Sequence, residues 1–228
     1  MPLGFNANHL PAMASEYVAW VDVMGTQISM SRSISATANF IFKLHIAAIR
    51  ARLEGLRIYP VMDGFYAATP NKSQMLSFLR NVFRSVAEEF NATEEPQHRF
   101  IIRGGLAFGP VIHGQDVGQC AAELQNNPAY SNSVLLGMPM VQAHLSERDA
   151  PPFGVFVHES ARVFAPDGTD PLHWIWWKWE NDNSPVWAAL KDTLIAHLQW
   201  CKARAQAILY SSDRILAHEK MVDQYFQE

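Results

Sequence analysis

The chain has 228 residues, of which 49% are hydrophobic and 18% are charged. This balance is typical of a globular protein that buries a sizeable core, and it excludes an intrinsically disordered chain. The formal net charge of −4 and the lack of any run of Lys or Arg argue against a nucleic-acid backbone as the binding partner.

Neither export nor insertion into a membrane is expected from the sequence. Residues 1–16 contain no Lys or Arg and include two prolines, which does not resemble a signal peptide. No apolar stretch approaches the roughly 20 residues that a membrane-spanning helix requires. Cys120 and Cys201 are too few for a disulfide framework and suit a reducing compartment. The sequence therefore predicts a cytoplasmic protein without a membrane partner.

The first part of the chain is expected to form a strand, a helix and a hairpin. Residues 17–23 are apolar and rich in β-branched side chains, and Gly25 follows them, which predicts a short buried strand. Apolar side chains recur at helical spacing over 31–53, which predicts a helix. Residues 56–59 and 65–69 are predicted strands, because they flank an Asp-Gly pair, which is a hairpin signal.

A second helix and a second hairpin are expected next. Thr69 and Pro70 have the residue types of an N-cap and a first helical position, and the helix is predicted to run to about Phe90. Residues 98–108 form a predicted strand. Its hairpin partner is predicted to begin at 111–112, after a Gly-Pro turn.

The remaining elements complete an α+β domain. Predicted helices cover 120–127, 137–148 and 159–164, and predicted strands cover 154–158 and 174–179. A long amphipathic helical segment then starts at Ser184 and Pro185, with a break near 211–213. The order of elements predicts a sandwich in which helices cover one mostly antiparallel sheet over residues 1–183. The helical residues 184–228 are expected to pack on this domain as a C-terminal extension.

Asp22 is the first candidate for chemistry. A carboxylate inside an apolar strand is costly to bury unless it is paired or binds a metal. Gly25 follows it closely and allows the backbone to approach a ligand and to turn N–H groups outward. This combination suits a site for Mg²⁺ and a triphosphate. The alternative is that Asp22 caps a helix or accepts a hydrogen bond in the core.

Asp63 is the second candidate, at the predicted tip of the first hairpin. The strands of that hairpin are expected to lie beside the strand that carries Asp22. Two carboxylates, each at the end of a central strand, suit a hard cation that prefers oxygen ligands. The alternative for Asp63 is an ordinary Asp-Gly turn.

Arg103 is the third candidate. It lies in an apolar predicted strand next to Gly104 and Gly105. A buried arginine needs an anion, and the planar guanidinium group suits the geometry of a phosphate. The alternative is a structural salt bridge to a carboxylate in the core.

Five segments, taken in order, resemble the motifs of the class III nucleotide cyclases. The first two segments carry the candidate aspartates, and the third carries the candidate arginine. They are Val21 to Thr26, Met62 to Ala67, Arg103 to Val111, Leu136 to Ala143 and Gly154 to Ser160. Their order and spacing agree with the family over about residues 16–165.

The resemblance implies the family's ferredoxin-like sandwich and its metal-dependent chemistry. Two divalent ions, Mg²⁺ or Mn²⁺, would be held by Asp22, Val23 and Asp63. The 3′-hydroxyl of a nucleoside triphosphate would attack the α-phosphorus, and pyrophosphate would leave.

The resemblance also implies how the substrate is bound. Amides from Val23 to Thr26, with Gly25 among them, would hold the β- and γ-phosphates. Arg103 would neutralise the charge that builds on the phosphates. Because the sites of this family form between two subunits, a head-to-tail homodimer with shared active sites is implied.

The helix after Gly137 departs from the family pattern. In the purine cyclases this helix supplies an Asn and an Arg that stabilise the transition state. Here those positions fall on Val141 and Leu145, with Gln142 and His144 beside them. A catalytically silent nucleotide-binding regulator of the same fold is therefore an alternative to an active cyclase.

Tyr59 occupies the position that reads the base in the family. The purine cyclases place Lys or Glu four residues before the second metal-binding aspartate, which is Tyr59 when counted back from Asp63. This pattern resembles the bacterial pyrimidine cyclases of the antiphage system Pycsar. That resemblance implies UTP as substrate and cyclic UMP as a diffusible signal to a separate effector. The alternatives are CTP, or a purine cyclase whose base reader has moved.

Overall fold

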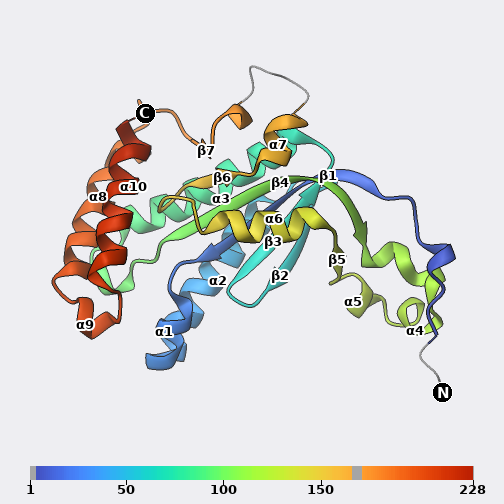
Figure 1. The fold of residues 1–228 in the computed structure, drawn as a ribbon. Coiled ribbons are helices and arrows are strands. Elements are labelled where there is room, and N and C mark those ends of the chain that lie inside the picture. The colour runs from blue at the N-terminus through green and yellow to red at the C-terminus, as the bar shows by residue number, and fades with distance from the viewer. Residues whose placement is uncertain (1–3, 166–170, 228) are drawn as a thin grey trace.

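A seven-stranded sheet forms the centre of the computed structural model, which describes residues 4–165 and 171–227 (Figure 1). The strand order is β2-β3-β1-β4-β6-β7, and the short β5 pairs with β4. The strands are β1 (Ala14–Val23), β2 (Arg57–Val61), β3 (Gly64–Thr69), β4 (Ile102–His113), β5 (Leu135–Leu136), β6 (Val155–Val157) and β7 (Trp176–Trp177). Among the strands of the described residues, β4 and β6 pair in parallel and the other pairs are antiparallel. The predicted α+β class with a mostly antiparallel sheet is confirmed.

Helices connect and cover the strands. The α-helices are α1 (Thr26–Arg32), α2 (Ile34–Ala51), α3 (Lys72–Ala92), α4 (Ala122–Gln125), α5 (Pro128–Ser131), α6 (Met138–Glu147), α7 (Glu159–Val163), α8 (Pro185–Lys202), α9 (Ala205–Ile208) and α10 (Ser212–Gln227). Short 3₁₀ turns are η1 (Ala7–His9), η2 (Pro96–His98), η3 (Gly114–Cys120) and η4 (Pro171–His173). Among the described residues, no helix is long and apolar enough to cross a membrane.

The central strand β1 is covered on both faces of the sheet. Its alternate side chains point to opposite faces, and both sets are packed against other elements. Tyr17 and Val21 join the main core under α2 and α3. Val18 and Trp20 point to the other side, where Met140 and Ala143 of α6 pack against them. The unbroken apolar run that predicts a buried strand therefore reflects two covered faces.

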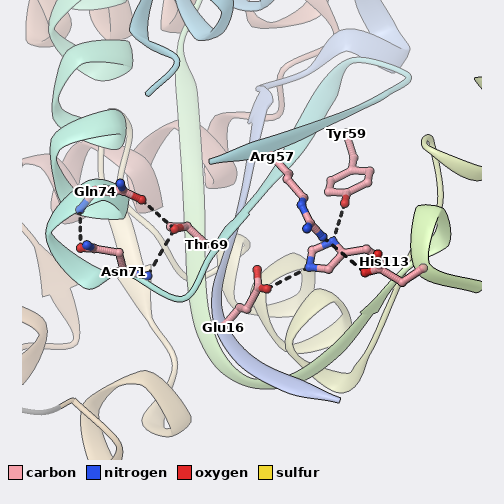
Figure 2. Close-up of polar contacts among 8 residues, drawn as sticks. Glu16, Arg57, Tyr59, Thr69, Asn71, Gln74 and His113 are labelled. Carbon is pink, nitrogen blue, oxygen red and sulfur yellow. Dashed lines mark hydrogen bonds and ion pairs between the residues drawn. The ribbon is translucent and has the colours of Figure 1, made fainter. Parts of the chain in front are cut away.

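The two faces are covered by different helices, as Figure 1 shows for α6 in front of the sheet. On the α3 side, the start of the helix is fixed by a short polar chain (Figure 2). The side-chain oxygen of Asn71 caps the helix and accepts a hydrogen bond from the backbone N–H of Gln74. The backbone N–H of Asn71 donates to the Thr69 hydroxyl. The predicted cap at Thr69 is therefore displaced to Asn71, because the asparagine side chain is the one that reaches the first-turn amide.

Helix α6 lies very close to β4, and a glycine makes this possible. A Cβ atom on Gly105 would lie 2.0 Å from the carbonyl oxygen of Ala143. No other residue type fits there, so Gly105 sets the depth at which α6 packs on the sheet. The approach brings the end of α6, at Glu147, over the part of β4 that carries Arg103.

The C-terminal helices α8 and α10 pack against each other, and α8 packs on α3 (Figure 1). Leu190 and Leu194 of α8 and Tyr225 of α10 belong to the main core cluster. The break predicted near 211–213 is confirmed, since residues between α8 and α10 form only the short α9 and two turns.

Three predicted elements differ from the structure. The helix predicted over 31–53 is divided at Ser33, whose extended backbone caps α2 and lets α1 turn away. The second hairpin is wrong: Gly109 and Pro110 lie within one continuous strand, β4, because Pro110 pairs with Ser15 on β1. Pairing of β4 with β6 stops at Leu106, so Pro110 lies along an edge on that side, where proline is tolerated.

The last predicted strand, 174–179, is reduced to β7. Only its two central residues pair with β6. Trp177 and Trp179 are buried in the core, whereas Trp174 is exposed. A strand at the sheet edge needs only a short pairing when its side chains are held by the helices beneath it.

Candidate active site

Asp22 lies at the end of β1, between Gly64 on β3 and Arg103 on β4 in the register of the sheet. Side chains of paired residues point to the same face, so Asp22 and Arg103 are neighbours. Oδ1 of Asp22 is buried and has no hydrogen-bond partner among the residues the structure describes. A buried carboxylate oxygen without a partner is costly, which makes Asp22 a candidate ligand, although its carboxyl group also forms a side-chain hydrogen bond with Glu147.

Asp63 lies in the two-residue turn that joins β2 to β3. Met62 precedes it with a φ of 48°, in the left-handed region that non-glycine residues rarely adopt. The backbone of Met62 accepts a hydrogen bond from His45 of α2, and Thr26 Oγ1 at the start of α1 donates to Oδ2 of Asp63. The turn is therefore held from two helices, and its carboxylate is held next to the β1–α1 turn.

The β1–α1 turn, which follows Asp22, has open space at Gly25. Gly25 has a φ of +76°, and nothing lies within 4 Å of where its Cβ atom would be. Val23 has its side chain in the core, so only its backbone atoms are available to a ligand. The turn can therefore offer main-chain groups to phosphate oxygens, as the sequence predicts for Val23, Gly25 and Thr26.

Arg103 forms an ion pair with a residue that the sequence did not single out. Its Nη2 lies 2.5 Å from Oε1 of Glu147, and its Nη1 donates to the carbonyl oxygen of Arg148 at 3.3 Å. The Glu147 side chain is only 5% exposed. Nε of Arg103 is buried without a partner among the described residues. The alternative of a structural salt bridge thus holds for one side of the guanidinium group, while Nε remains available to a ligand.

The environment of Asp22 favours a bound cation. The pKa of Asp22 is raised to about 8, mainly by burial and then by the negative charge of Glu147, against the opposing charge of Arg103. Asp63 adds a second like charge. Three carboxylates therefore share one guanidinium group, and a divalent cation would supply the missing positive charge.

The donor set fits a hard divalent ion that takes only some of its ligands from the protein and the rest from water or substrate. Within 4–165 and 171–227, no group of three or more His, Cys, Asp or Glu side chains has the arrangement of a metal site. Mg²⁺ is usually bound by one or two carboxylates together with waters and substrate phosphates. Asp22, Asp63 and the backbone of Val23 match that pattern, with the unpartnered Asp22 oxygen as the specific sign.

Tyr59 belongs to a separate, buried network on the same face of the sheet (Figure 2). The side chain is 4% exposed, and its hydroxyl lies 2.5 Å from Nδ1 of His113. Nε2 of His113 lies 2.9 Å from Oε1 of Glu16. Burial raises the pKa of Tyr59, and the nearby charge of Arg57 opposes this rise. Arg57 in turn pairs with Asp116 at 3.7 Å. The structure therefore does not bring the Tyr59 hydroxyl together with the two aspartates.

The family positions on α6 are occupied by exposed apolar side chains. Val141 is 50% exposed and Leu145 is 51% exposed. His144 packs edge-on against Trp20, and Gln142 accepts a long hydrogen bond, 3.5 Å, from Ser160. None of these side chains contacts Asp22 or Asp63 in the interactions described above.

Comparisons with known proteins place the fold. No protein-family model matches the sequence, and no curated protein matches it. Solved structures match in fold. A bacterial light-regulated adenylyl cyclase aligns with a TM-score of 0.53 at 15% identity, over 69% of this chain and 46% of that chain.

Two structures of the guanylyl cyclase domain of the RhoGC fusion protein from the aquatic fungus Blastocladiella emersonii also align. A double mutant in monomeric form has a TM-score of 0.50 at 19% identity, over 67% of this chain and 83% of that one. A dimeric form has a TM-score of 0.50 at 17% identity, over 68% and 85%. The chain therefore has the fold of guanylyl and adenylyl cyclase domains.

Proposed function

We propose that this chain is a nucleotide cyclase, which converts a nucleoside triphosphate to the 3′,5′-cyclic monophosphate and pyrophosphate. The observation that carries the proposal is the unpartnered buried oxygen of Asp22 beside Asp63, at the end of the central strands of a fold that cyclase domains share. Burial, like charges and a hydrogen bond with Glu147 raise the pKa of Asp22, and carboxylates perturbed in this way are concentrated at functional sites.

Asp22, Asp63 and the backbone of Val23 would hold two divalent ions, Mg²⁺ or Mn²⁺. When bound, these ions polarise the α-phosphate and lower the pKa of the 3′-hydroxyl. Thr26 orients Asp63 through its hydroxyl and offers its amide, with that of Gly25, to the phosphate oxygens.

Arg103 would contribute through the atom that the ion pair leaves unused. Glu147 holds the Nη2 side of its guanidinium group, which fixes the orientation of the plane. Nε has no partner among the described residues and would donate to a phosphate oxygen. This arrangement places a fixed positive charge where negative charge builds during phosphoryl transfer.

The proposed substrate is a pyrimidine nucleotide, with UTP favoured over CTP, and the proposed role is that of a second-messenger synthase in antiphage defence, in the cytoplasm. Tyr59 supports the choice of base, because the position lacks the charged or long polar reader of a purine cyclase. The likeness of this pattern to the Pycsar cyclases supports cyclic UMP as a signal to a separate effector. For Tyr59 to contact a base, its hydroxyl must exchange its bond with His113 for one to the base.

We also propose a homodimer with shared sites, with Tyr59 contributed by one chain and the metal ligands by the other. Exposed apolar side chains support it, on the hairpin tip at Met62 and along α6 at Met138, Val141 and Leu145. Apolar side chains that gather on one face of a domain are typical of a protein interface.

One assay tests the activity and the base together. The purified protein is incubated with each of the four NTPs and Mn²⁺, and the products are resolved. Cyclic UMP is the expected product. Cyclic AMP or cyclic GMP would refute the pyrimidine assignment and leave a cyclase, whereas no product from any NTP, with nucleotide binding retained, would support the silent regulator.

The silent regulator is a second candidate because of one observation. Val141 and Leu145 expose apolar groups where purine cyclases supply polar groups to the transition state.

A complementation assay distinguishes a site shared between two chains from a site within one chain. Asp63→Ala and Tyr59→Ala protomers are each expected to be inactive, and the heterodimer formed by mixing them is expected to regain activity. If subunits exchange and activity does not return, the site lies within one chain.

A further inference from the structure

A cavity of about 430 Å³ lies between the β1–α1 turn and the C-terminal helices. Residues of α1, the start of α2 and the segment leading into β4 form one side, and residues of α8 to α10 form the other. Figure 1 shows α1 and α9 at the same end of the molecule. Met24 and Gly25 line the cavity, so it adjoins the turn after Asp22. Its volume is in the range of small-molecule sites.

The charge of the lining has one sign. Among the described residues, no Asp or Glu lines the cavity, whereas four arginines do: Arg32, Arg99, Arg103 and Arg214. The whole chain has more acidic than basic side chains, 22 against 18, so this lining departs from the composition of the chain. A concave surface of one charge concentrates ligands of the opposite charge.

Arg103 and Arg214, from distant parts of the chain, both act electrostatically on a half-buried histidine of the lining, His218. Nδ1 of His218 on α10 is hydrogen-bonded to the hydroxyl of Tyr210. Burial and the charges of Arg103 and Arg214 lower the pKa of His218 to about 4. The histidine is therefore neutral at neutral pH, and of the two arginines near it Arg103 is paired with Glu147. In the part of the chain that the structure describes, neither Arg32 nor Arg214 forms an ion pair with an acidic side chain.

The rest of the wall is aromatic and apolar. Phe40 and Phe100 stack with ring centroids 5.3 Å apart, and Trp200 stacks on His197 at 5.9 Å. A purely inorganic anion would gain nothing from these rings. A ligand with both an anionic end and a flat or apolar part would contact both kinds of wall.

We propose that this cavity binds an organic phosphate. Arg32, Arg103 and Arg214 contact the phosphate, and the apolar part of the ligand packs on Phe40 and Trp200. The site goes beyond the proposed function, since it needs neither turnover nor the two aspartates. Two sources carry this chemistry: the polyphosphate of a nucleotide bound at Gly25, or a separate phosphorylated small molecule.

Titration calorimetry with inorganic tripolyphosphate, in buffer without divalent ions, tests the anion site. The wild-type protein is expected to bind, and Arg214→Ala and Arg32→Ala are each expected to weaken binding about tenfold, because each removes one charge-assisted donor. Arg204→Ala is the matched control. Arg204 lies on the same extension, over the ring of Trp200, and does not line the cavity.

Two results would overturn the proposal: no binding by the wild-type protein, or equal binding by the wild type, Arg214→Ala and Arg32→Ala. Circular dichroism checks that each variant is folded, and two arginines on separate helices ensure that one unstable variant does not decide the test. Binding that is lost equally in Arg204→Ala would also overturn it, since the effect would then be one of net charge.

A second arm identifies the source of the phosphate. A non-hydrolysable UTP analogue with Mn²⁺ is added to saturation before tripolyphosphate. Loss of tripolyphosphate binding assigns the cavity to the substrate's polyphosphate, and undiminished binding assigns it to a separate ligand. If no NTP is cyclised but arginine-dependent binding persists, the proposed function fails and the anion site stands.

Discussion

Two polar clusters lie on the same face of the sheet, and they differ in how completely their atoms are paired. At one end of β1, Glu16, His113 and Tyr59 form a chain in which both nitrogens of the histidine have partners (Figure 2). At the other end, Asp22 leaves a buried oxygen and Arg103 leaves a buried nitrogen without one. The first cluster is buried, whereas Asp22, Asp63 and Arg103 are partly exposed, so a ligand can reach the second cluster.

The difference separates a structural network from a ligand site. A satisfied network stabilises the fold, because breaking it leaves a buried group unpaired. An unsatisfied cluster costs stability until a ligand completes it, which is a common condition of functional sites. The two clusters should therefore respond to mutation in opposite ways, and substitutions in each can test this.

The largest expected effect is on turnover at the unsatisfied cluster. Asp22→Asn and Asp63→Asn each remove a proposed metal ligand with almost no change in shape. Turnover is expected to fall about 1,000-fold or more, which corresponds to about 4 kcal/mol of transition-state stabilisation. The rate of cyclic nucleotide formation at saturating Mn²⁺ measures it.

The control is Asp192→Asn, an exposed carboxylate on α8. It is expected to leave turnover unchanged. A loss of less than about tenfold in both Asp22→Asn and Asp63→Asn would remove the two residues from the metal site, because a lost ligand costs far more.

The next effect is on stability, and it has the opposite sign. In the folded chain the pKa of Asp22 is about 8, against 3.8 ordinarily, so the folded state retains a proton that the unfolded state has released. The free energy of unfolding therefore falls as the pH rises from about 4 to about 8. Asp22→Asn cannot ionise and is expected to be more stable than the wild type by several kcal/mol above pH 8.

Urea unfolding at several pH values, with EDTA present, measures this difference. It is expected to vanish below about pH 3, where Asp22 is mostly protonated in both states. An Asp22→Asn protein that is less stable than the wild type at every pH would make Asp22 a structural residue and end the contrast between the clusters.

Within the satisfied cluster, Glu16 contacts no part of the proposed substrate, so its loss should lower stability and leave activity nearly unchanged. Glu16→Ala leaves Nε2 of His113 buried without a partner, which is expected to cost about 2 kcal/mol in the free energy of unfolding. Turnover per folded molecule is expected to stay within about threefold. Loss of turnover comparable to that of Asp22→Asn, in a folded protein, would instead make the Glu16 network part of the catalytic machinery.

The smallest effect is expected at the rim of the satisfied cluster. The side chains of Arg57 and Asp116 are 38% and 42% exposed, and their ion pair is long at 3.7 Å. Asp116→Asn is expected to change the free energy of unfolding by less than about 0.5 kcal/mol, because water screens exposed pairs. Thermal and urea unfolding measure this change. A loss as large as that of Glu16→Ala would extend the network to the surface.

The sequence by itself determined the local pattern of the fold. The apolar run of β1, the hairpin with its Asp-Gly pair and the periodicity of α3 and α8 each identify an element, because alternation and helical spacing follow from backbone geometry alone. The same pattern places Asp22 at a strand end and Asp63 in a turn. It failed at Gly109 and Pro110, where pairing with β1 keeps the strand continuous despite two turn-forming residues.

Only the tertiary structure decided which polar groups are paired. Glu147 reaches Arg103 because Gly105 lets α6 pack closely on β4. The local sequence around Glu147 does not predict that its side chain is buried. Tyr59 meets His113, 54 residues away, so its hydroxyl is occupied in a way that its strand position does not reveal. Burial and partnership depend on segments that are distant in the chain, and they set the pKa and the chemistry of each group.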